Sequence, residues 1–274
     1  MTREQDPAFD ALARRIAGRA GLDVAAYKDR CLRRRIAVRM RACGAHTYGE
    51  YLAELDKRPD ELDRLLDALT INVTKFYRNP EAWDWLLRHA LVDLIRSKQG
   101  RLTAWSAGCA SGEEAYTIAM VLAEACEQAG HPAWLERVRI DATDIDRESL
   151  ERARAARYHE RVFSEAPMNV VSRYCTRVSP EEFEVQKRLR AVVHVGRLDL
   201  LRNTPPLAAY DLILCRNVII YFDRPTQERL MEAFRLALAP GGYLVLGKVE
   251  TIFGPTREQF QLVEPRERIY RKPE

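Results

Sequence analysis

The sequence lacks the features of a membrane, secreted or disulfide-rich protein. No apolar run in its 274 residues approaches the roughly 18 that a membrane helix needs, and the start, MTREQD, lacks the apolar core of a secretory signal. The cysteines form no CxxC pair, so neither a zinc site nor a disulfide framework is indicated; they are Cys31, Cys43, Cys109, Cys126, Cys175 and Cys215. We therefore expect a cytoplasmic protein with reduced thiols and no metal.

A strong excess of one charge is also missing. Lys and Arg number 44 against 40 Asp and Glu, and the net charge of +4 is too small by itself to indicate a nucleic-acid partner. With 47% hydrophobic and 31% charged residues the chain can bury a core and stay in solution, which excludes a disordered protein.

The first 70 residues show the apolar spacing of helices. Phe9, Leu12 and Ile16 recur at three to four residues, as do the leucines between positions 62 and 69. We predict a small all-α domain over residues 1–70.

One segment of this domain, Tyr27–Arg41, is strongly basic. A single acid, Asp29, stands against Lys28, Arg30, Arg33, Arg34, Arg35, Arg39 and Arg41. Two interpretations are open, a solvated helix face or a docking surface for an acidic partner.

Beyond residue 100 short apolar runs alternate with helical stretches. The predicted strands are Leu102–Ser106, Val138–Thr143, Ala191–Val195, Leu212–Cys215 and Tyr243–Leu246; the predicted helices are Glu113–Gln128, Arg147–Ala156 and Pro225–Leu238. This alternation indicates an open α/β fold with parallel strands, closed by a hairpin of Phe260–Val263 and Arg268–Arg271. We predict a linker over 71–99, the sheet domain over 100–274 and an insertion at about 158–192 that serves recognition.

Ligands of open α/β sheets bind at the carboxyl ends of the strands. The first strand ends in a small-residue turn, Gly108–Gly112, that leads into Glu113 and Glu114. Two acids at this helix start disfavour a pyrophosphate, and hence NAD, and favour a cationic ligand. The alternative is that both glutamates only stabilise the helix as acids of its first turn.

Two other strand ends carry polar residues. Asp144 follows the second strand, where an acid typically accepts hydrogen bonds from ribose hydroxyls, whereas Asp146 can cap the next helix. Arg216 and Asn217 interrupt an apolar run, and polar residues buried without partners cost about 1–3 kcal/mol each. We expect both to line the ligand site.

Together these segments resemble class I S-adenosylmethionine-dependent methyltransferases and, closely, the CheR family, which esterifies glutamates of bacterial chemoreceptors. The stretches that carry the resemblance span both domains: LTINVTKFYRNPEAW (69–83), WSAGCASGEEAYTIAM (105–120), ATDID (142–146), YDLILCRNVIIYFD (210–223) and PGGYLVLG (240–247). The resemblance implies a Rossmann-like methyltransferase sheet with a small all-α N-terminal domain and a small insertion subdomain.

The resemblance also implies the site. The residues that match the family's cofactor ligands are Asn72, Thr74, Arg78, Glu113, Asp144, Asp199, Leu200, Arg216 and Asn217. Tyr221 would lie near the reaction centre, with Arg78 as the second residue assigned to catalysis. By residue type alone, Arg78 could equally form an interdomain salt bridge and Tyr221 could complete the core.

The implied reaction transfers a methyl group from S-adenosylmethionine to a glutamate carboxylate, giving a methyl ester and S-adenosylhomocysteine. A glutamate of pKa about 4.3 is ionised at neutral pH, so we assign no general base. The family docks the acidic helical bundle of its receptors with the N-terminal domain, and we assign that role to Arg33, Arg34, Arg35 and Arg39.

Two departures from the family pattern stand out. Lys248 and Val249 replace its usual small polar residue before Glu250, and the loop Arg177–Glu181 is short and lacks glycine. In some members that region grips a tethering peptide at the receptor C-terminus, so we expect weak or absent tethering here. Other readings are a methyltransferase for another protein or for nucleic acid, a cofactor-binding sensor or scaffold without activity and, least favoured, a nicotinamide enzyme.

Overall fold

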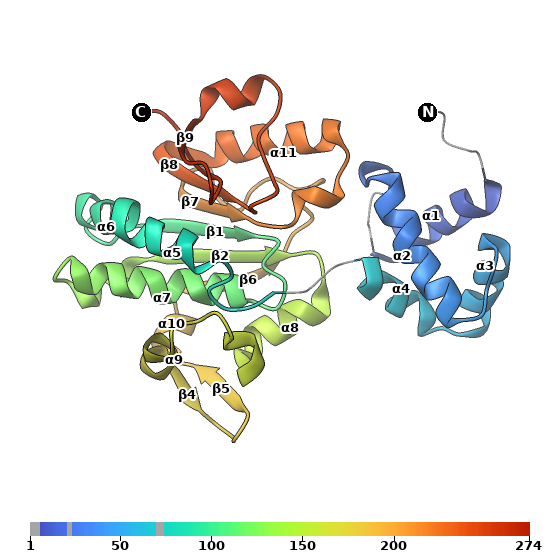
Figure 1. Cartoon of the computed structure of the whole chain (residues 1–274), viewed down its shortest axis with the longest axis horizontal. Helices are drawn as coiled ribbons and strands as arrows, with labels where there is room; N and C mark the ends of the chain where they lie inside the picture. Colours follow the sequence, from blue (N-terminus) through green and yellow to red (C-terminus); the bar gives the residue numbers. More distant parts are fainter. Residues whose placement is uncertain (1–5, 21–23, 70–73) are drawn as a thin grey trace. The chain divides into compact units, whose positions relative to one another are not determined.

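The computed structural model describes residues 6–20, 24–69 and 74–274 (Figure 1). By their contacts the residues form two compact units. The N-terminal unit comprises Met1–Asn72 with Tyr221–Thr226, and the sheet unit comprises Val73–Ile220 with Gln227–Glu274. Among the described helices, none has both the length and the apolar character needed to cross a membrane.

The N-terminal unit is helical, as predicted. Its elements are α1 (Pro7–Ala20), the 3-10 turn η1 (Val24–Ala26), α2 (Asp29–Ala42), α3 (Tyr48–Lys57) and α4 (Glu61–Leu69). Thr47 caps α3 by accepting a hydrogen bond from the amide of Glu50. The apolar periodicity places its core residues on the facing sides of the helices; those fully buried include Leu12, Ile16, Ile36, Tyr51, Leu55 and Leu65.

The distant segment Tyr221–Thr226 packs within this unit. Lys28 donates its amide to the carbonyl of Tyr221 at 2.9 Å, and Asp223 donates its amide to the carbonyl of Ala26 at 2.8 Å. The rings of Tyr27 and Phe222 meet edge to face, with centroids 5.1 Å apart. These contacts place Tyr221 with the helices of the N-terminal unit.

The sheet unit is built on seven strands in the order β6-β2-β1-β7-β8-β10-β9 (Figure 1). Their bounds are β1 (Thr103–Ala107), β2 (Arg139–Asp144), β6 (Val193–Arg197), β7 (Tyr210–Cys215), β8 (Leu238–Leu246), β9 (Gln261–Glu264) and β10 (Ile269–Arg271). The first five in spatial order pair in parallel, and β10 pairs antiparallel with both β8 and β9. The predicted α/β class, parallel sheet and closing hairpin are confirmed.

Side-chain alternation gives the sheet two buried faces. Ala104 of β1 belongs to the apolar cluster that contains the buried face of α7 (Glu113–Gln128). Its neighbour Trp105 points to the opposite face, where its ring meets Phe234 of α11 (Arg224–Ala237) at 5.5 Å. Helices therefore cover both faces, which explains the near-continuous burial of β1, β2 and β7.

The region predicted as a linker is helical. It forms α5 (Pro80–Leu86), a π-helical turn (Leu87–Leu91) and α6 (Val92–Ser97), and its apolar side chains, including Trp83, Leu86 and Ile95, join the cluster of the sheet unit. Outside the insertion, the other elements are η3 (Pro132–Arg137), α8 (Arg147–Ala155), η5 (Ile219–Tyr221) and η6 (Pro255–Gln259).

The expected helix Pro225–Leu238 ends one residue early, at Ala237, and β8 begins at Leu238. The expected glycine turn is present as an irregularity within β8, because the register with β7 shifts between Leu238 and Tyr243 and Gly241 has φ 74°. Gly241 donates its amide to the carbonyl of Lys272 at 3.1 Å, and Lys272 donates its amide to Gly242 at 2.9 Å. Pairing with the C-terminal segment thus extends the strand through residues that by themselves favour a turn.

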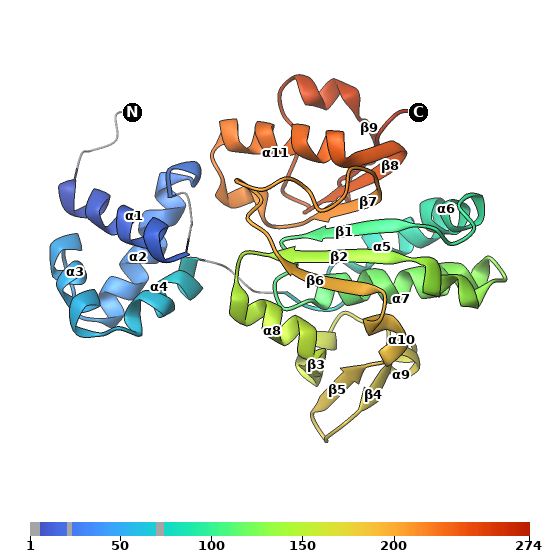
Figure 2. The same ribbon diagram turned by 180° about the vertical axis from the view of Figure 1, so that it is seen from behind.

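The insertion forms a subdomain between α8 and β6 (Figure 2). It contains β3 (Arg157–His159), η4 (Glu160–Phe163), α9 (Met168–Tyr174), β4 (Cys175–Arg177), β5 (Glu182–Val185) and α10 (Lys187–Arg190). The strands make a separate antiparallel sheet in the order β3-β5-β4.

Candidate functional site

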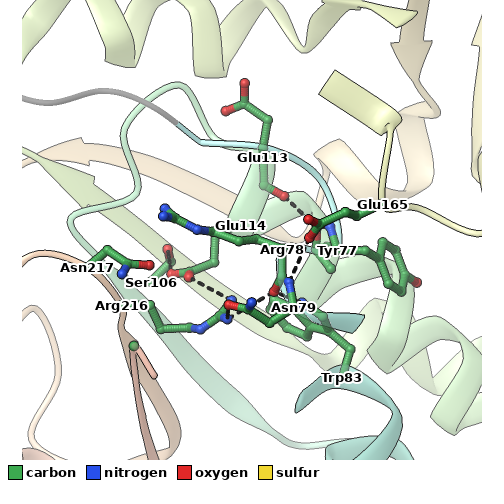
Figure 3. A network of polar contacts seen from close by, with 12 residues as sticks. Tyr77, Arg78, Asn79, Trp83, Ser106, Glu113, Glu114, Glu165, Arg216 and Asn217 are labelled. Atoms are coloured by element: carbon green, nitrogen blue, oxygen red, sulfur yellow. Dashed lines mark hydrogen bonds and ion pairs between the residues drawn. The ribbon is translucent and has the colours of Figure 1, made fainter. Parts of the chain in front are cut away.

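Polar side chains from the ends of β1 and β7 and from the start of α7 lie near the segment before α5 at the carboxyl edge of the sheet, and Figure 3 shows the network among them. The turn after β1 is tightly built. Gly108 and Cys109 donate their amides to the carbonyl of Thr143 at 2.8 and 3.0 Å. A Cβ on Gly112 (φ 94°) would lie 2.9 Å from both Ala153 Cβ and Tyr158 Oη, so only glycine fits there.

Asp144 fixes this turn to the end of β2. Its Oδ2 accepts the amide of Ala110 at 2.8 Å and its Oδ1 accepts the amide of Asp146 at 3.0 Å. Burial raises the pKa of Asp144 despite these bonds. Asp146 caps α8 by accepting from the amide of Glu148, as one of the two alternatives expected. Asp144 is thus the acid presented at the strand end.

The two glutamates that begin α7 have different surroundings. Glu113 is 4% exposed and accepts a hydrogen bond from Ser111 Oγ at 2.7 Å. Glu114 accepts from Ser106 Oγ at 2.8 Å and lies 3.8 Å from a guanidinium nitrogen of Arg216. Burial raises the pKa of both carboxyl groups. A cation placed beside them would stabilise their charged forms.

Arg216, directly after β7, is buried and links the loop to the segment before α5. Its Nη2 donates to the carbonyl of Arg78 at 2.9 Å and to Asn79 Oδ1 at 2.8 Å (Figure 3). Its guanidinium carbon lies 5.6 Å from the ring centroid of Trp83. Burial lowers its pKa, against the opposing charge of Glu114. Arg216 Nε has no hydrogen-bond partner among the residues that the structure describes.

Asn217 adopts a left-handed conformation with φ 62° and donates its amide to Glu250 Oε2 at 2.8 Å. Glu250 also accepts the amides of Gly247 at 2.6 Å and Ile220 at 3.3 Å. Burial raises the pKa of Glu250, although these bonds oppose the rise. Sequence analysis missed Glu250 as a site residue. Glu250 lies three residues beyond Gly247, which directly follows β8, and only Lys248 and Val249 before it were noted, as departures from the family pattern.

The other predicted cofactor residues lie close by or outside the described ranges. Thr74 and Arg78 belong to the partly buried segment before α5, whereas Asn72 lies outside the described residues. Leu198 donates its amide to the carbonyl of Asp144 at 2.9 Å, which brings Asp199 and Leu200 beside the end of β2. Asp199 accepts the amide of Leu201 at 2.9 Å.

The predicted docking arginines do not share one open surface. Arg35 is 8% exposed, donates to the carbonyl of Leu69 and lies 4.3 Å from the ring centroid of Tyr221. Arg39 makes a two-pronged ion pair with buried Glu61, at 2.9 and 2.6 Å.

The other two arginines differ from each other. Arg33 pairs with Asp29 at 2.8 Å and covers the ring of Phe9 at 4.0 Å, whereas Arg34 is exposed. The expectation for Arg35 and Arg39 is therefore corrected, because their helical positions turn them toward partners inside the N-terminal unit.

The donors at this edge fit a ligand with hydroxyl, ammonium and carboxylate groups. Asn217 Oδ1 and Arg216 Nε are both buried and lack partners among the described residues, so an acceptor and a donor remain for a ligand. Glu113, Asp144 and Asp199 add carboxylates. S-adenosylmethionine carries all three kinds of group.

Comparison with known proteins agrees with this geometry. A family model described as the CheR methyltransferase SAM-binding domain matches residues 72–269, and one described as the CheR methyltransferase all-alpha domain matches residues 7–70. A chemotaxis protein methyltransferase of Klebsiella aerogenes is 34% identical, with 93% of this chain and 91% of the relative covered.

Two further chemotaxis protein methyltransferases are each 33% identical. For the one from Escherichia coli the match covers 94% of this chain and 88% of the relative, and for the one from Borreliella burgdorferi 85% and 84%. Because both family models match in order along the chain and the relatives are similar over most of their length, the chain belongs to the CheR family and is a methyltransferase that uses S-adenosylmethionine as its cofactor.

Proposed function

We propose that this protein methylates glutamate side chains of bacterial chemoreceptors in the cytoplasm, giving glutamate methyl esters and S-adenosylhomocysteine. The family and the chemotaxis names of its relatives support this substrate class. The observation that carries the cofactor half of the proposal is the set of acids at the carboxyl edge of the sheet, where Glu113 is buried, Asp144 is partly buried and desolvation raises the pKa of both.

The cofactor supplies an electrophilic methyl group on a positively charged sulfur. In our assignment Asp144 and Asp199 bind the ribose hydroxyls, and Glu113 faces the ammonium end. Arg78 pairs with the cofactor carboxylate, and Arg216 and Asn217 offer Nε and Oδ1, which have no hydrogen-bond partner within the described part of the chain. Asn72, Thr74 and Leu200 complete the ligand set through their sequence match to the family.

The acceptor needs no general base, because a receptor glutamate is already ionised at neutral pH. Its carboxylate oxygen forms the new bond to carbon as the carbon–sulfur bond breaks, and the electron pair of that bond stays on sulfur. The protein then contributes alignment and exclusion of water, with Tyr221 orienting the reactants. Opposite charges neutralise each other in this step, so a dry site favours it.

Receptor docking is assigned to the exposed side of α2. Arg34, one of the four predicted arginines, is exposed, as are Lys28, Arg30 and Arg41. We define these four residues as the α2 basic surface. An acidic helical bundle would be attracted to it, with an association rate that falls as salt rises.

We also propose that a tethering peptide is bound weakly or not at all by the insertion. The turn from β4 to β5 is closed locally, because Val178 donates its amide to the carbonyl of Glu182 at 2.9 Å. Calorimetry with an isolated receptor-tail peptide tests this statement, and tight binding would refute it.

The decisive experiment measures methyl transfer to receptors. The protein is incubated with S-adenosylmethionine labelled in its methyl group and with membranes that carry chemoreceptors. We expect base-labile label on the receptor band, as carboxyl methyl esters require. Binding of S-adenosylhomocysteine without receptor label would instead indicate a sensor or another acceptor, and loss of both would refute the cofactor assignment.

A further inference from the structure

Glu165 joins the insertion to the segment that precedes α5. It lies between η4 and α9, and its Oε2 accepts the amide of Asn79 at 2.8 Å (Figure 3). Its Oε1 is ion-paired with Lys75 Nζ. Burial alone would raise the pKa of Glu165, but the bonds from Lys75 and Asn79 lower it. One ionised carboxylate therefore holds both ends of the segment 75–79.

This segment needs such support because its backbone is unusual. Tyr77 has φ 52° and Asn79 has φ 57°, in the left-handed region that side chains other than glycine rarely adopt. A bulky aromatic residue does not favour this conformation by itself, so tertiary contacts must maintain it. Besides Glu165, the carbonyl of Val162 provides one of them by accepting the amide of Phe76 at 2.9 Å.

The aromatic side chains of the insertion make a second set of contacts. Phe76 is fully buried, stacks on Phe163 with centroids 4.2 Å apart and meets Tyr158 edge to face at 5.0 Å. Tyr158 also donates its hydroxyl to the carbonyl of Ser111 at 2.7 Å. The insertion thus contacts both the segment before α5 and the turn after β1.

The contacts continue to the buried arginine of the site. Asn79 Oδ1 and the carbonyl of Arg78 accept hydrogen bonds from Arg216 Nη2, so the backbone at Asn79 sets where that guanidinium lies. We propose that the insertion is a structural part of the cofactor site, with Glu165 as the positioning residue that aligns Arg78 and Asn79 with Arg216. This inference rests on the proposed binding of S-adenosylmethionine at that edge.

The test compares three substitutions with the wild-type chain. Glu165→Ala removes both bonds, and Glu165→Gln keeps one acceptor but no charge. Glu181→Ala is the matched control, since Glu181 lies on the same insertion, is 70% exposed and pairs with His159. Dissociation constants for S-adenosylhomocysteine are measured by calorimetry at a temperature where circular dichroism shows every variant folded.

We expect Glu181→Ala to bind like wild type, Glu165→Gln to bind a few-fold more weakly and Glu165→Ala to bind about tenfold more weakly, as the loss of a charge-assisted bond implies. With receptor as acceptor, the KM for S-adenosylmethionine should rise in the same order. A merely structural role would lower the melting temperature of Glu165→Ala and leave both constants unchanged, which would overturn the inference.

A fourth variant separates the two partners of Glu165. Lys75→Met leaves the bond to the Asn79 amide intact and should weaken binding less than Glu165→Ala. Equal losses in the two variants would overturn the role of the Asn79 contact. Failure of the wild-type chain to bind S-adenosylhomocysteine would instead refute the proposed function, so the two failures are distinguishable.

Discussion

Buried Glu250 at the edge of the sheet holds backbone amides in place. Glu250 accepts three amides from two loops, and Gly247 leaves it room, because a Cβ there would lie 2.7 Å from Glu250 Oε2. We call these three hydrogen bonds to Glu250 the Glu250 clamp. The left-handed backbone of Asn217 depends on this clamp, and Asn217 Oδ1 has no partner among the described residues. Glu250 therefore couples stability of the fold to the cofactor site.

We predict that Glu250→Gln lowers both the stability of the fold and the affinity for the cofactor. Glutamine retains one acceptor oxygen and turns an amide donor toward backbone N–H groups, which should lower the free energy of unfolding by about 1–3 kcal/mol. Affinity for S-adenosylhomocysteine should fall as the Asn217 loop loses its support. Urea unfolding and calorimetry measure the two effects, with exposed Glu258→Gln as the control. If Glu250→Gln bound S-adenosylhomocysteine with wild-type affinity, the proposed support of the Asn217 loop by Glu250 would be contradicted.

Single residues differ in how far their roles could be predicted from sequence. Asp144 and Arg216 follow predicted strands, so the general rule for α/β sheets places them at the ligand edge. Glu165 and Glu250 act on backbone amides of residues 86 and 33 positions away, respectively. No local pattern encodes such a contact, and we could recognise these two residues only from the folded chain.

Helix α2 shows that a charge count does not identify an exposed surface. Leu32, Ile36 and Met40 are buried, and residues three positions beyond Leu32 and Ile36 share their face of the helix. These residues are Arg35 and Arg39, which contact Leu69 and Glu61 of α4. The same periodicity that predicts the core of α2 thus also predicts which arginines turn inward, which the interpretation of the whole segment as one basic surface overlooked.

We predict that the double substitution Arg34→Glu and Arg41→Glu impairs receptor methylation selectively. Reversal of two exposed charges should raise the KM for receptor about tenfold at low salt, and the difference should shrink as salt screens the interaction. S-adenosylhomocysteine should bind as in wild type. Initial rates at several salt concentrations measure the effect.

The matched control reverses two exposed arginines of the sheet unit, Arg88→Glu and Arg96→Glu. It changes the net charge by the same amount and should leave the KM for receptor near wild type. Equal effects of the two double variants would show that overall charge, and not the α2 basic surface, governs docking. Arg35→Ala should differ from both double variants by lowering the free energy of unfolding, because it removes the buried contacts of Arg35.

On the scale of the whole molecule, the two units differ in the direction in which the pKa values of their acidic residues are shifted. In the N-terminal unit burial opposes ionisation of Glu61, but bonds from Arg39 and Tyr51 lower its pKa. In the sheet unit burial raises the pKa of Glu113, Glu114 and Asp144. In the sheet unit, burial therefore disfavours the ionised form of these carboxylates, and a cationic ligand beside them would stabilise it.

This contrast predicts opposite effects of mild acid on stability and on cofactor binding. In the folded sheet unit, carboxyl groups with raised pKa values bind protons at a higher pH than they do in the unfolded chain, where their pKa is about 4. Protonation therefore favours the folded state, and the stability of the sheet unit should rise as the pH falls from 7 toward 5. Glu61, with its lowered pKa, stays ionised over this window and gives the N-terminal unit no such gain. Thermal unfolding at several pH values measures the change.

Over the same window S-adenosylmethionine should bind more weakly, since its sulfonium and ammonium charges favour ionised carboxylates and binding must release the protons. S-adenosylhomocysteine lacks the sulfonium charge and should show a smaller loss. Glu113→Gln should flatten the pH dependence of S-adenosylmethionine binding, whereas Glu124→Gln should not, because Glu124 is another α7 acid of raised pKa that we place outside the ligand set. If both variants kept the wild-type pH dependence, Glu113 would not face the cationic end of the cofactor.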